Sequence, residues 1–494
     1  MKIAFVTPEL DPLVRRTALA DIAAALPKAL KEIGNDARVF MPVTQQTQLA
    51  GVEDIENEGS VTVSDTLGSA TFQISRGLVG AVTVYLFEHH QLFGSRGPYG
   101  GDDGPYEDNW RRYALFSRAV LESLTVVNFE PEVIHCFDWT TGLLPLIQEL
   151  EFAQRRPDHP AARAGTYFQI HNLAMQGSFE REVLKHIGLP HRLFQTTGGI
   201  ELAGKVNFLK AGAEFSTILG THSPGHALRI QELDRGYGLE EVFRRRGKEL
   251  VGIANGIDYH TWDPSNDPLL PKSFSAKDRG LAGKAKCKAV LQQALGLESR
   301  ARTPVAAMIG RFDADSGFEL VLEILTSVLE RGVEVVLMGA GRPDTHERLR
   351  TMQTTFQGRC RVIEGYQLSI AHQIMGGADM LLLPSHYHPG NALCAIGMRY
   401  GAVPIIYAGS GLDDYVLDLE KNSRGTGFHF QTYSSDSLLG AVDSARKLYK
   451  SLAPWNTVVG RCLRQDFSWA STAGEYVKAY RRVTRRTRPR EQSA

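Results

Sequence analysis

The chain has 494 residues, a length that corresponds to two large domains or three ordinary ones at about 100–200 residues each. Its composition, 43% apolar and 22% charged with 55 basic and 55 acidic residues, excludes a disordered chain and argues against binding nucleic acid or anionic membrane over its whole surface. No run approaches the roughly 18 apolar residues of a membrane span, and the five cysteines are too widely spaced for a C-x-x-C site. We therefore expect a soluble, cytoplasmic protein with reduced thiols and with no metal site, nucleic-acid partner or membrane partner.

Short apolar runs alternate with helical patterns along the chain, which is typical of βαβ units in parallel sheets. The predicted strands are residues 3–7, 37–43, 82–87, 133–136, 166–170 and 249–253 in the first half, and 304–309, 334–338, 361–363, 380–384, 403–406 and 427–430 in the second. The clearest predicted helices are residues 20–33, 109–124, 284–295, 435–451 and 469–484. The pattern predicts an α/β protein built of doubly wound parallel sheets.

A segment rich in proline and aspartate, from Trp262 to about Asp278, interrupts this alternation and indicates a connection between domains. We expect one domain over residues 1–262, a second over 263–455, and a helical segment over 456–484 that packs back on the first domain. The two domains are expected to face each other across a cleft. Residues 485–494 are rich in arginine and indicate a solvated end, with contact to a polyanion as the alternative.

The loops that follow strands contain the candidate site residues, because doubly wound sheets bind ligands beyond the carboxyl ends of their strands. Arg15 and Arg16 precede a predicted helix and fit a phosphate, with a solvated turn as the alternative. Asp138 suits a sugar hydroxyl, a partner histidine or a helix cap. His171 suits a ligand or a purely structural hydrogen bond, and Arg311 follows a strand of the second half.

Several common catalytic motifs are absent from the sequence. It contains no G-x-x-x-x-G-K-[ST], no H-E-x-x-H and no G-x-S-x-G, so nothing supports an NTPase, a zincin or a serine hydrolase. The turn at residues 339–344 departs from G-x-G-x-x-G because Asp344 stands at the place of the third glycine. A dinucleotide site is therefore not favoured.

Several segments, taken in order, resemble the family of bacterial glycogen synthases and plant starch synthases. They are residues 27–30, 99–119, 135–142, 170–177, 205–212, 255–264 and 398–401, so the resemblance extends from Met1 to about Val483. It implies a GT-B fold and a retaining glucosyltransferase that moves glucose from ADP-glucose to an α-1,4-glucan. It also implies an acceptor-side first domain, a second domain that binds the nucleotide sugar, and no cofactor or metal.

The resemblance assigns roles to individual residues. Tyr366 matches the tyrosine that stacks on adenine, and Arg311 matches an arginine on the donor diphosphate. The other positions that match the family's site are His171, Asp138, Asn255 and Asp21. Among all of these, the resemblance implies that His171, Asp138 and Arg311 are catalytic.

Four loops depart from the family pattern. Arg15 keeps the charge of the lysine in Lys-x-Gly-Gly-Leu, but the glycines are absent, and Gly411 lies in Gly-Ser-Gly-Leu in place of Thr-Gly-Gly-Leu. Ser316 stands where a lysine follows the diphosphate arginine by five residues, and His388 stands for the glutamate that holds the donor glucose. Losing one preorganised group commonly costs on the order of 10²–10³ in rate. Weakened or lost activity is therefore expected.

Three hypotheses follow from this combination of a kept framework and changed loops. The chain is a glucosyltransferase that uses ADP-glucose and an α-1,4-glucan, or it is a glycosyltransferase with a changed donor or acceptor. The third hypothesis is a pseudoenzyme that binds glucan or an adenine nucleotide and regulates a true synthase. Its assembly is left open between a homo-oligomer and a complex with a partner synthase.

Overall fold

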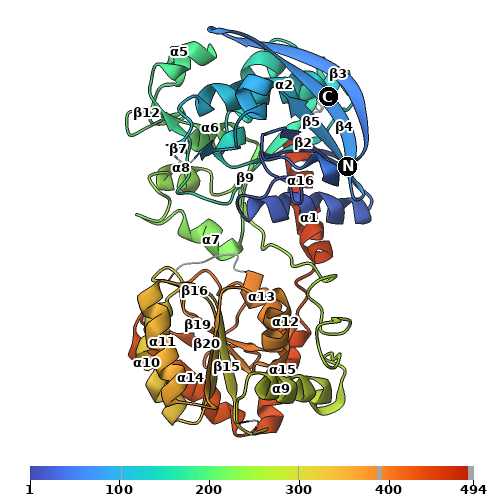
Figure 1. The fold of residues 1–494 in the computed structure, drawn as a ribbon. Coiled ribbons are helices and arrows are strands. Elements are labelled where there is room, and N and C mark those ends of the chain that lie inside the picture. The colour runs from blue at the N-terminus through green and yellow to red at the C-terminus, as the bar shows by residue number, and fades with distance from the viewer. Residues whose placement is uncertain (102, 299, 387–391, 488–494) are drawn as a thin grey trace, which may run out of the picture. The chain divides into compact units, whose positions relative to one another are not determined.

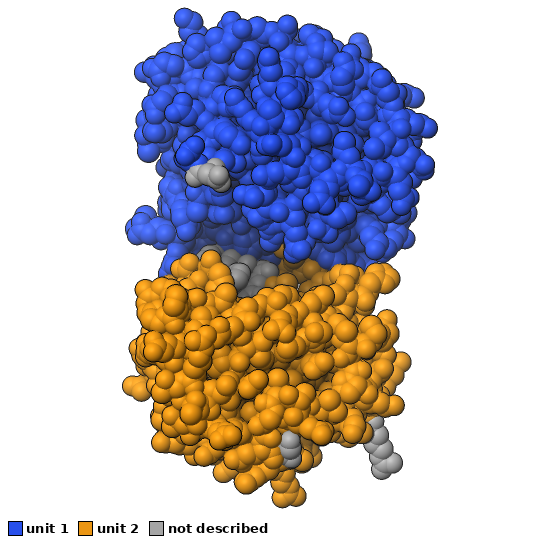
Figure 2. Space-filling view, viewed as in Figure 1, with its two compact units in different colours: residues 1–253, 469–494 blue, residues 254–468 orange. Residues whose placement is uncertain are grey.

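The computed structural model describes residues 1–101, 103–298, 300–386 and 392–487. The chain forms two compact units, coloured blue and orange in Figure 2. Unit 1 comprises residues 1–253 together with the segment from Trp469, and unit 2 comprises residues 254–468. Each unit buries its own apolar side chains around its own main sheet. The two-domain α/β architecture that the alternating pattern predicts is therefore present.

Unit 1 is built on a nine-stranded sheet with the order β14-β13-β9-β8-β1-β2-β5-β4-β3. Its parallel strands are β1 (Lys2–Val6), β2 (Asp36–Pro42), β5 (Val82–Glu88), β8 (Val133–Phe137), β9 (Gly165–Ile170), β13 (Ile218–Thr221) and β14 (Leu250–Gly252). The strands β8 and β9 are buried at every residue, as expected for parallel strands that are covered on both faces.

A long antiparallel hairpin extends this sheet beyond β5 (Figure 1). Its strands are β3 (Glu53–Asp65) and β4 (Gly68–Val79). The hairpin is missing from the predicted strands, as is β13. In the half of the hairpin next to its turn, buried and exposed residues alternate. The hairpin therefore lacks the continuous apolar run by which a fully buried strand is recognised.

Unit 2 contains a six-stranded parallel sheet with the order β17-β16-β15-β18-β19-β20. Its strands are β15 (Val305–Phe312), β16 (Glu334–Gly341), β17 (Cys360–Glu364), β18 (Met380–Leu383), β19 (Val403–Tyr407) and β20 (Phe428–Phe430). All six lie within a few residues of the predicted ranges. Apart from the partly buried Val362, their Val, Ile, Leu and Met residues are buried, which explains why the apolar runs identify them well.

Helices connect the strands, and most of the longer ones bury an apolar stripe, whereas α11 buries only Leu349. In unit 1 the longer ones are α1 (Leu19–Glu32), α2 (Asn109–Val126), α6 (Phe208–Phe215) and α16 (Trp469–Thr487). In unit 2 they are α9 (Ala282–Ala294), α10 (Phe318–Glu330), α11 (Pro343–Thr355), α12 (Leu368–Gly377), α13 (Ala392–Arg399), α14 (Ser435–Tyr449) and α15 (Leu452–Leu463). The last helix, α16, packs against α1 and β9, which are distant from it in sequence (Figure 1).

The unit boundaries differ from the predicted domain boundaries. The first unit ends at Ile253, not at 262, because the Ile253 N–H makes a last hydrogen bond to the carbonyl of Thr221, whereas Ile257 already pairs with Phe467 of unit 2. The helix α15 overlaps the start of the predicted segment 456–484 but belongs to unit 2, where it packs against α13 and α14. The change of unit therefore falls at 468/469. Residues 488–494 of the basic tail lie outside the described residues.

Candidate functional site

Each main sheet has one point where neighbouring strands connect toward opposite sides. This point lies between β1 and β8 in unit 1 and between β15 and β18 in unit 2. The carboxyl ends of strands at such points are the usual ligand positions of doubly wound folds. We call the segments at the carboxyl ends of β1, β8 and β9 the unit 1 edge (residues 7–21, 138–142 and 171–177). The segments at the carboxyl ends of β15, β17 and β19 are the unit 2 edge (residues 311–317, 364–368 and 407–412).

A buried glutamate organises the first loop of the unit 1 edge. Glu9 is fully buried, and its carboxylate accepts hydrogen bonds from the N–H groups of Arg16, at 2.5 Å, and Thr17, at 2.8 Å. The hydroxyls of Thr17 and Tyr99 also donate to it. Because Glu9 occupies the N–H groups of Arg16 and Thr17, which lie just before α1, this loop offers a ligand its arginine side chains in place of these two amides.

The arginine side chains of this loop are exposed. Arg15 forms an ion pair with Asp21 at 2.9 Å, and its side chain is 63% exposed. Arg16 is exposed as well. Burial raises the pKa of Asp21, and the positive charge of Arg15 opposes that rise. The predicted site residues Arg15 and Asp21 are therefore neighbours, and the loop displays two guanidinium groups.

Asp138 and His171 lie together at the ends of β8 and β9. The Asp138 carboxylate accepts a hydrogen bond from the His171 backbone N–H at 2.7 Å, and the two side chains approach to 3.7 Å. Asp138 has a φ of 52°, a conformation that costs on the order of 1–3 kcal/mol in a residue other than glycine and is common at functional sites. Both ring nitrogens of His171 are buried and have no hydrogen-bond partner among the described residues.

A second histidine lies beyond β13 and is missing from the predicted site residues. His226, on the short helix α7 (Pro224–Arg229), approaches the Thr221 hydroxyl through Nδ1 at 2.5 Å. Burial lowers the pKa of His226 to about 3, and the charges of Arg229 and His171 act in the same direction. His226 is therefore neutral near pH 7. The signal that could have identified it is the apolar run of β13, which precedes it directly.

Arg311 and Ser316 lie in one tight loop at the unit 2 edge. The Arg311 side chain, 71% exposed, pairs with Asp313 at 3.0 Å and with Asp315 at 3.6 Å. The Ser316 hydroxyl donates to the carbonyl of Arg311 at 2.5 Å. The one cation of this loop is therefore matched by two carboxylates, and the Ser316 hydroxyl is engaged with the backbone.

The same loop is packed closely against the end of β18. Gly317 has a φ of 72°, and a Cβ there would lie 2.2 Å from the Pro384 carbonyl oxygen, so the position requires glycine. Three aromatic rings gather beside it: His386 lies 5.5 Å from Tyr407 and 4.7 Å from Tyr433, centroid to centroid. These rings are missing from the predicted site residues.

The remaining predicted residues lie in separate places of unit 2. Tyr366 follows β17, is 57% exposed, and has a pKa raised by burial of the rest of its surface. Gly411 is buried in the turn after β19, with a φ of 89°. The Asn255 side-chain oxygen is buried and has no hydrogen-bond partner among the described residues. His388 lies outside the described residues.

Nothing in the described part of the chain suggests a metal centre. There, no group of three or more His, Cys, Asp or Glu side chains is arranged to hold a metal ion. All five cysteines are buried and free, and burial raises the pKa of the Cys136 thiol far above its usual range. Over the same residues, the structure contains no helix long and apolar enough to cross a membrane.

Family models match both units. Residues 2–245 match the model of the starch synthase catalytic domain, and residues 296–456 match the model of glycosyl transferases group 1.

Full-length relatives are also found. The chain is 37% identical to glycogen synthase 2 of Geobacter sulfurreducens over 485 residues, which cover 97% of this chain and 98% of the relative. It is 37% identical to a glycogen synthase of Anaeromyxobacter sp. over 483 residues, which cover 97% and 99%. Among solved structures it matches the catalytic domain of starch synthase IV from Arabidopsis thaliana, bound to ADP and acarbose, with a TM-score of 0.82 and 28% identity over 98% of this chain and 99% of that chain.

Proposed function

Because the chain belongs to the glycogen and starch synthase family of GT-B glycosyltransferases, we propose that it transfers glucose from ADP-glucose to an α-1,4-glucan, at a much reduced rate. The observation that carries the proposal is the pair of Asp138 and His171 at the unit 1 edge. Its strained aspartate and its unpartnered histidine nitrogens are a costly arrangement that a purely structural role does not explain.

The reaction asks for two kinds of group. Positive charge develops at the anomeric carbon and negative charge on the departing ADP, so fixed donors must face both in the transition state. His171 is suited to hydrogen-bond a sugar hydroxyl or the reacting centre, with Asp138 fixing its loop. Arg311 supplies a guanidinium group for the diphosphate at the unit 2 edge, and Arg15 and Arg16 give the unit 1 edge its own positive charge.

The adenine nucleotide is proposed to bind at the unit 2 edge. Tyr366 presents an exposed ring on which a base can stack, and Arg311 lies in the loop expected to hold the diphosphate. The starch synthase IV structure, which contains ADP and acarbose, supports an adenine nucleotide and an α-glucan as the ligands here too. Cytoplasmic location is proposed on the same grounds of relationship to bacterial glycogen synthases.

The reduced rate follows from the charges around Arg311. A diphosphate must compete with Asp313 and Asp315 for this guanidinium, and Ser316 offers no second cation. The same observation favours a second candidate: a protein that binds glucan or nucleotide without turnover and regulates a partner synthase. A changed donor is the third candidate, because Arg15 and Arg16 differ from the family's loop.

One experiment separates the three. Purified protein is titrated with ADP and with ADP-glucose by calorimetry, and ADP release is then measured with glycogen present. Binding of both with slow release of ADP, dependent on His171, supports the proposed transferase. Binding without release favours the regulator. No heat with either ligand overturns both ADP-based functions and directs the search to other sugar nucleotides.

A further inference from the structure

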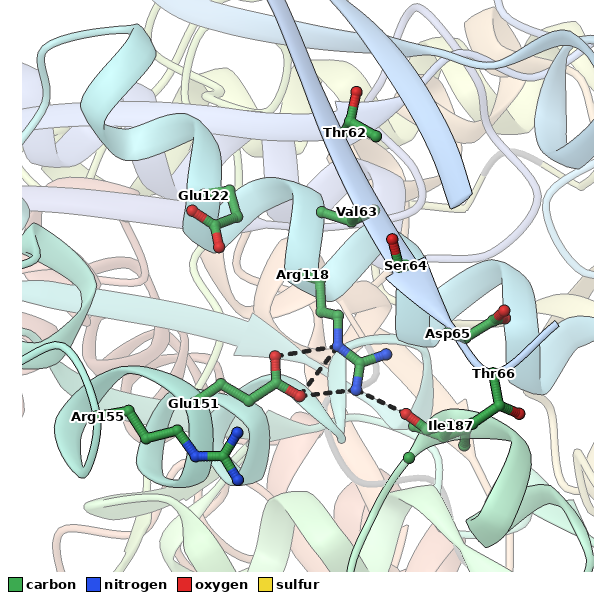
Figure 3. A pocket seen from close by; sticks show the side chains of 11 residues that line it. Thr62, Val63, Ser64, Asp65, Thr66, Arg118, Glu122, Glu151, Arg155 and Ile187 are labelled. Carbon is green, nitrogen blue, oxygen red and sulfur yellow. Dashed lines mark hydrogen bonds and ion pairs between the residues drawn. The ribbon is translucent and has the colours of Figure 1, made fainter. Parts of the chain in front are cut away.

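A polar pocket of about 370 Å³ lies in unit 1, apart from both edges (Figure 3). Its walls come from β3, from α2, from the segment that follows α3 (Leu144–Ile147), and from the end of α5 (Val183–Ile187). The lining residues are Thr62, Val63, Ser64, Asp65, Thr66, Arg118, Glu122, Glu151, Arg155, Ile187 and Gly188. The pocket has the size of a small-molecule site and shares no residue with the unit 1 edge or the unit 2 edge.

One wall is the last strand of the sheet. Five consecutive residues of the hairpin, 62–66, line the pocket, and β3 stands at the end of the strand order, paired with β4 only. An edge strand has a row of N–H and C=O groups that its own sheet does not use. The pocket therefore has backbone donors and acceptors of β3 available beside the Ser64 hydroxyl, whereas the N–H and the hydroxyl of Thr66 both donate to the carbonyl of His186.

Arg118 forms the opposite wall and is not fully partnered. It is 7% exposed; its Nε and Nη2 donate to the Glu151 carboxylate, at 3.0 and 2.7 Å, and Nη2 also donates to the Ile187 carbonyl. Figure 3 shows these bonds and a third nitrogen that makes none. This Nη1 is buried and has no hydrogen-bond partner in the described part of the chain. A buried donor without an acceptor is costly.

The charges of the pocket leave one further cation uncompensated. Each lining carboxylate has a basic partner: Asp65 pairs with Arg111 at 2.7 Å, Glu122 with Arg156 at 2.5 Å, and Glu151 with Arg118 at 2.7 Å. Arg155 is exposed and forms no ion pair within the described residues. Two donors of the pocket are therefore still without an acceptor: the guanidinium group of Arg155 and the Nη1 of Arg118.

We propose that this pocket binds a small phosphorylated sugar or polyol. Guanidinium groups match the geometry and charge of a phosphate, so the phosphate is assigned to Arg155. The unbonded Nη1 of Arg118 lies on the other side of the Glu151 carboxylate (Figure 3) and donates to a hydroxyl oxygen of the ligand. The hydroxyl groups of the ligand face Ser64 and the free edge of β3. The binding holds the hairpin against α2. The inference is independent of the proposed transferase activity, because it uses none of its residues.

Calorimetry with three probes tests the proposal: sorbitol 6-phosphate, sorbitol and inorganic phosphate. Sorbitol 6-phosphate has no pyranose ring, so a site built for the donor glucose does not recognise it. We expect it to bind at least about tenfold more tightly than phosphate, and sorbitol to give no measurable heat, because a charge-assisted hydrogen bond contributes the larger share. Saturating ADP leaves the affinity unchanged. No binding of sorbitol 6-phosphate, or equal affinity for phosphate, overturns the proposal.

Variants locate the site. Arg155→Ala removes an exposed side chain and is expected to weaken sorbitol 6-phosphate about tenfold to a hundredfold, the effect of one charge-assisted hydrogen bond. Arg118→Lys keeps the positive charge, removes Nη1 and abolishes binding; its melting temperature shows whether it folds. Arg192→Ala, another exposed arginine of unit 1, is the matched control and leaves affinity unchanged. If Arg155→Ala binds sorbitol 6-phosphate as tightly as the unaltered chain does, the assignment of the ligand to this pocket is overturned.

Discussion

The unit 1 edge and the unit 2 edge differ in what their charged groups are paired with. At the unit 1 edge, the carboxylates of Glu9 and Asp138 accept hydrogen bonds from backbone N–H groups. His171 keeps its ring nitrogens free of partners in the described residues. At the unit 2 edge, the charge of Arg311 is taken up by two neighbouring carboxylates.

This comparison shows that the framework of a loop can be kept while its positive charge is balanced by neighbouring carboxylates. The strands and turns around Arg311 are intact, down to the glycine that packs against Pro384. What differs is the charge of a loop of seven residues, 311–317, which contains one basic and two acidic side chains. In unit 2, therefore, the strands and turns of this loop and the charges of its side chains are separate properties.

Restoring positive charge at the unit 2 edge is expected to have the largest effect. The double variant Ser316→Lys with Asp315→Gln adds a cation and removes the 90% exposed carboxylate that faces Arg311. Preorganised groups that stabilise a departing anion are worth on the order of 10²–10³ in rate. We expect ADP release from ADP-glucose with glycogen to rise by a factor of that order.

The matched control is Glu330→Gln, which removes one exposed negative charge at the far end of α10. It is expected to leave the rate unchanged. If the double variant is as slow as the unaltered chain, the charge of this loop is not what limits transfer, and the contrast between the two edges loses its functional meaning.

Tyr366→Ala tests whether the nucleotide end of the unit 2 edge is kept. Base stacking on an aromatic ring is worth about 1–3 kcal/mol, so the dissociation constant for ADP should rise by about tenfold or more. Leu368→Ala, two residues further and 50% exposed, is the control and should change little. An unchanged affinity for ADP in the Tyr366 variant would place the base elsewhere.

The smallest expected effect concerns stability and pH. Burial lowers the pKa of His135 well below its usual 6.5 and that of His226 to about 3. Both side chains therefore stay neutral in folded unit 1 at a pH at which the same histidines of the unfolded chain take up protons. The free energy of unfolding should therefore fall as the pH drops below about 6.5, by about 1.4 kcal/mol per pH unit for each group. Urea unfolding over this pH range measures the slope.

Unit 2 is expected to respond in the opposite range. Burial lowers the pKa of Lys284 to about 8, below the 10.5 of the unfolded chain, so unit 2 gains stability as the pH rises from about 8 to about 10.5. His135→Phe should flatten the acid slope of unit 1, whereas the exposed His90→Gln should not. Hydrogen exchange resolved by segment assigns each change to its unit; acid sensitivity confined to unit 2 would contradict this assignment.

Much of the fold can be predicted from the sequence because its parallel strands are buried on both faces and read as apolar runs. The strands of unit 2 and the central strands of unit 1 follow this rule. The hairpin β3–β4 does not, since large parts of it face solvent. The return of the last helical segment to the first domain is expected, but not the change of unit at 468/469, because α15 stays in unit 2 through contacts with α13 and α14 that the sequence does not reveal.

The candidate site is predictable to the extent that it follows strand ends. Asp138 and His171 stand directly after strands and do meet in space, and Arg311 is the second-last residue of β15. The role of Glu9 could not be predicted, because one of its partners, Tyr99, is 90 residues away. The pairing of Arg311 with Asp315 could not be predicted either, because it depends on the directions of the two side chains, which their spacing in the sequence does not reveal.

The docking of α16 on unit 1 has a consequence for the order of events during synthesis. Residues 254–468 leave the ribosome before Trp469 does, so unit 2 can complete its core while unit 1 still lacks its last helix. Until then the side chains that α16 covers, among them His135, which bonds to Tyr480 at 2.7 Å, and Tyr167, are open to water. The domain that begins first is therefore finished last, and it passes through a stage in which a chaperone would find its exposed sheet.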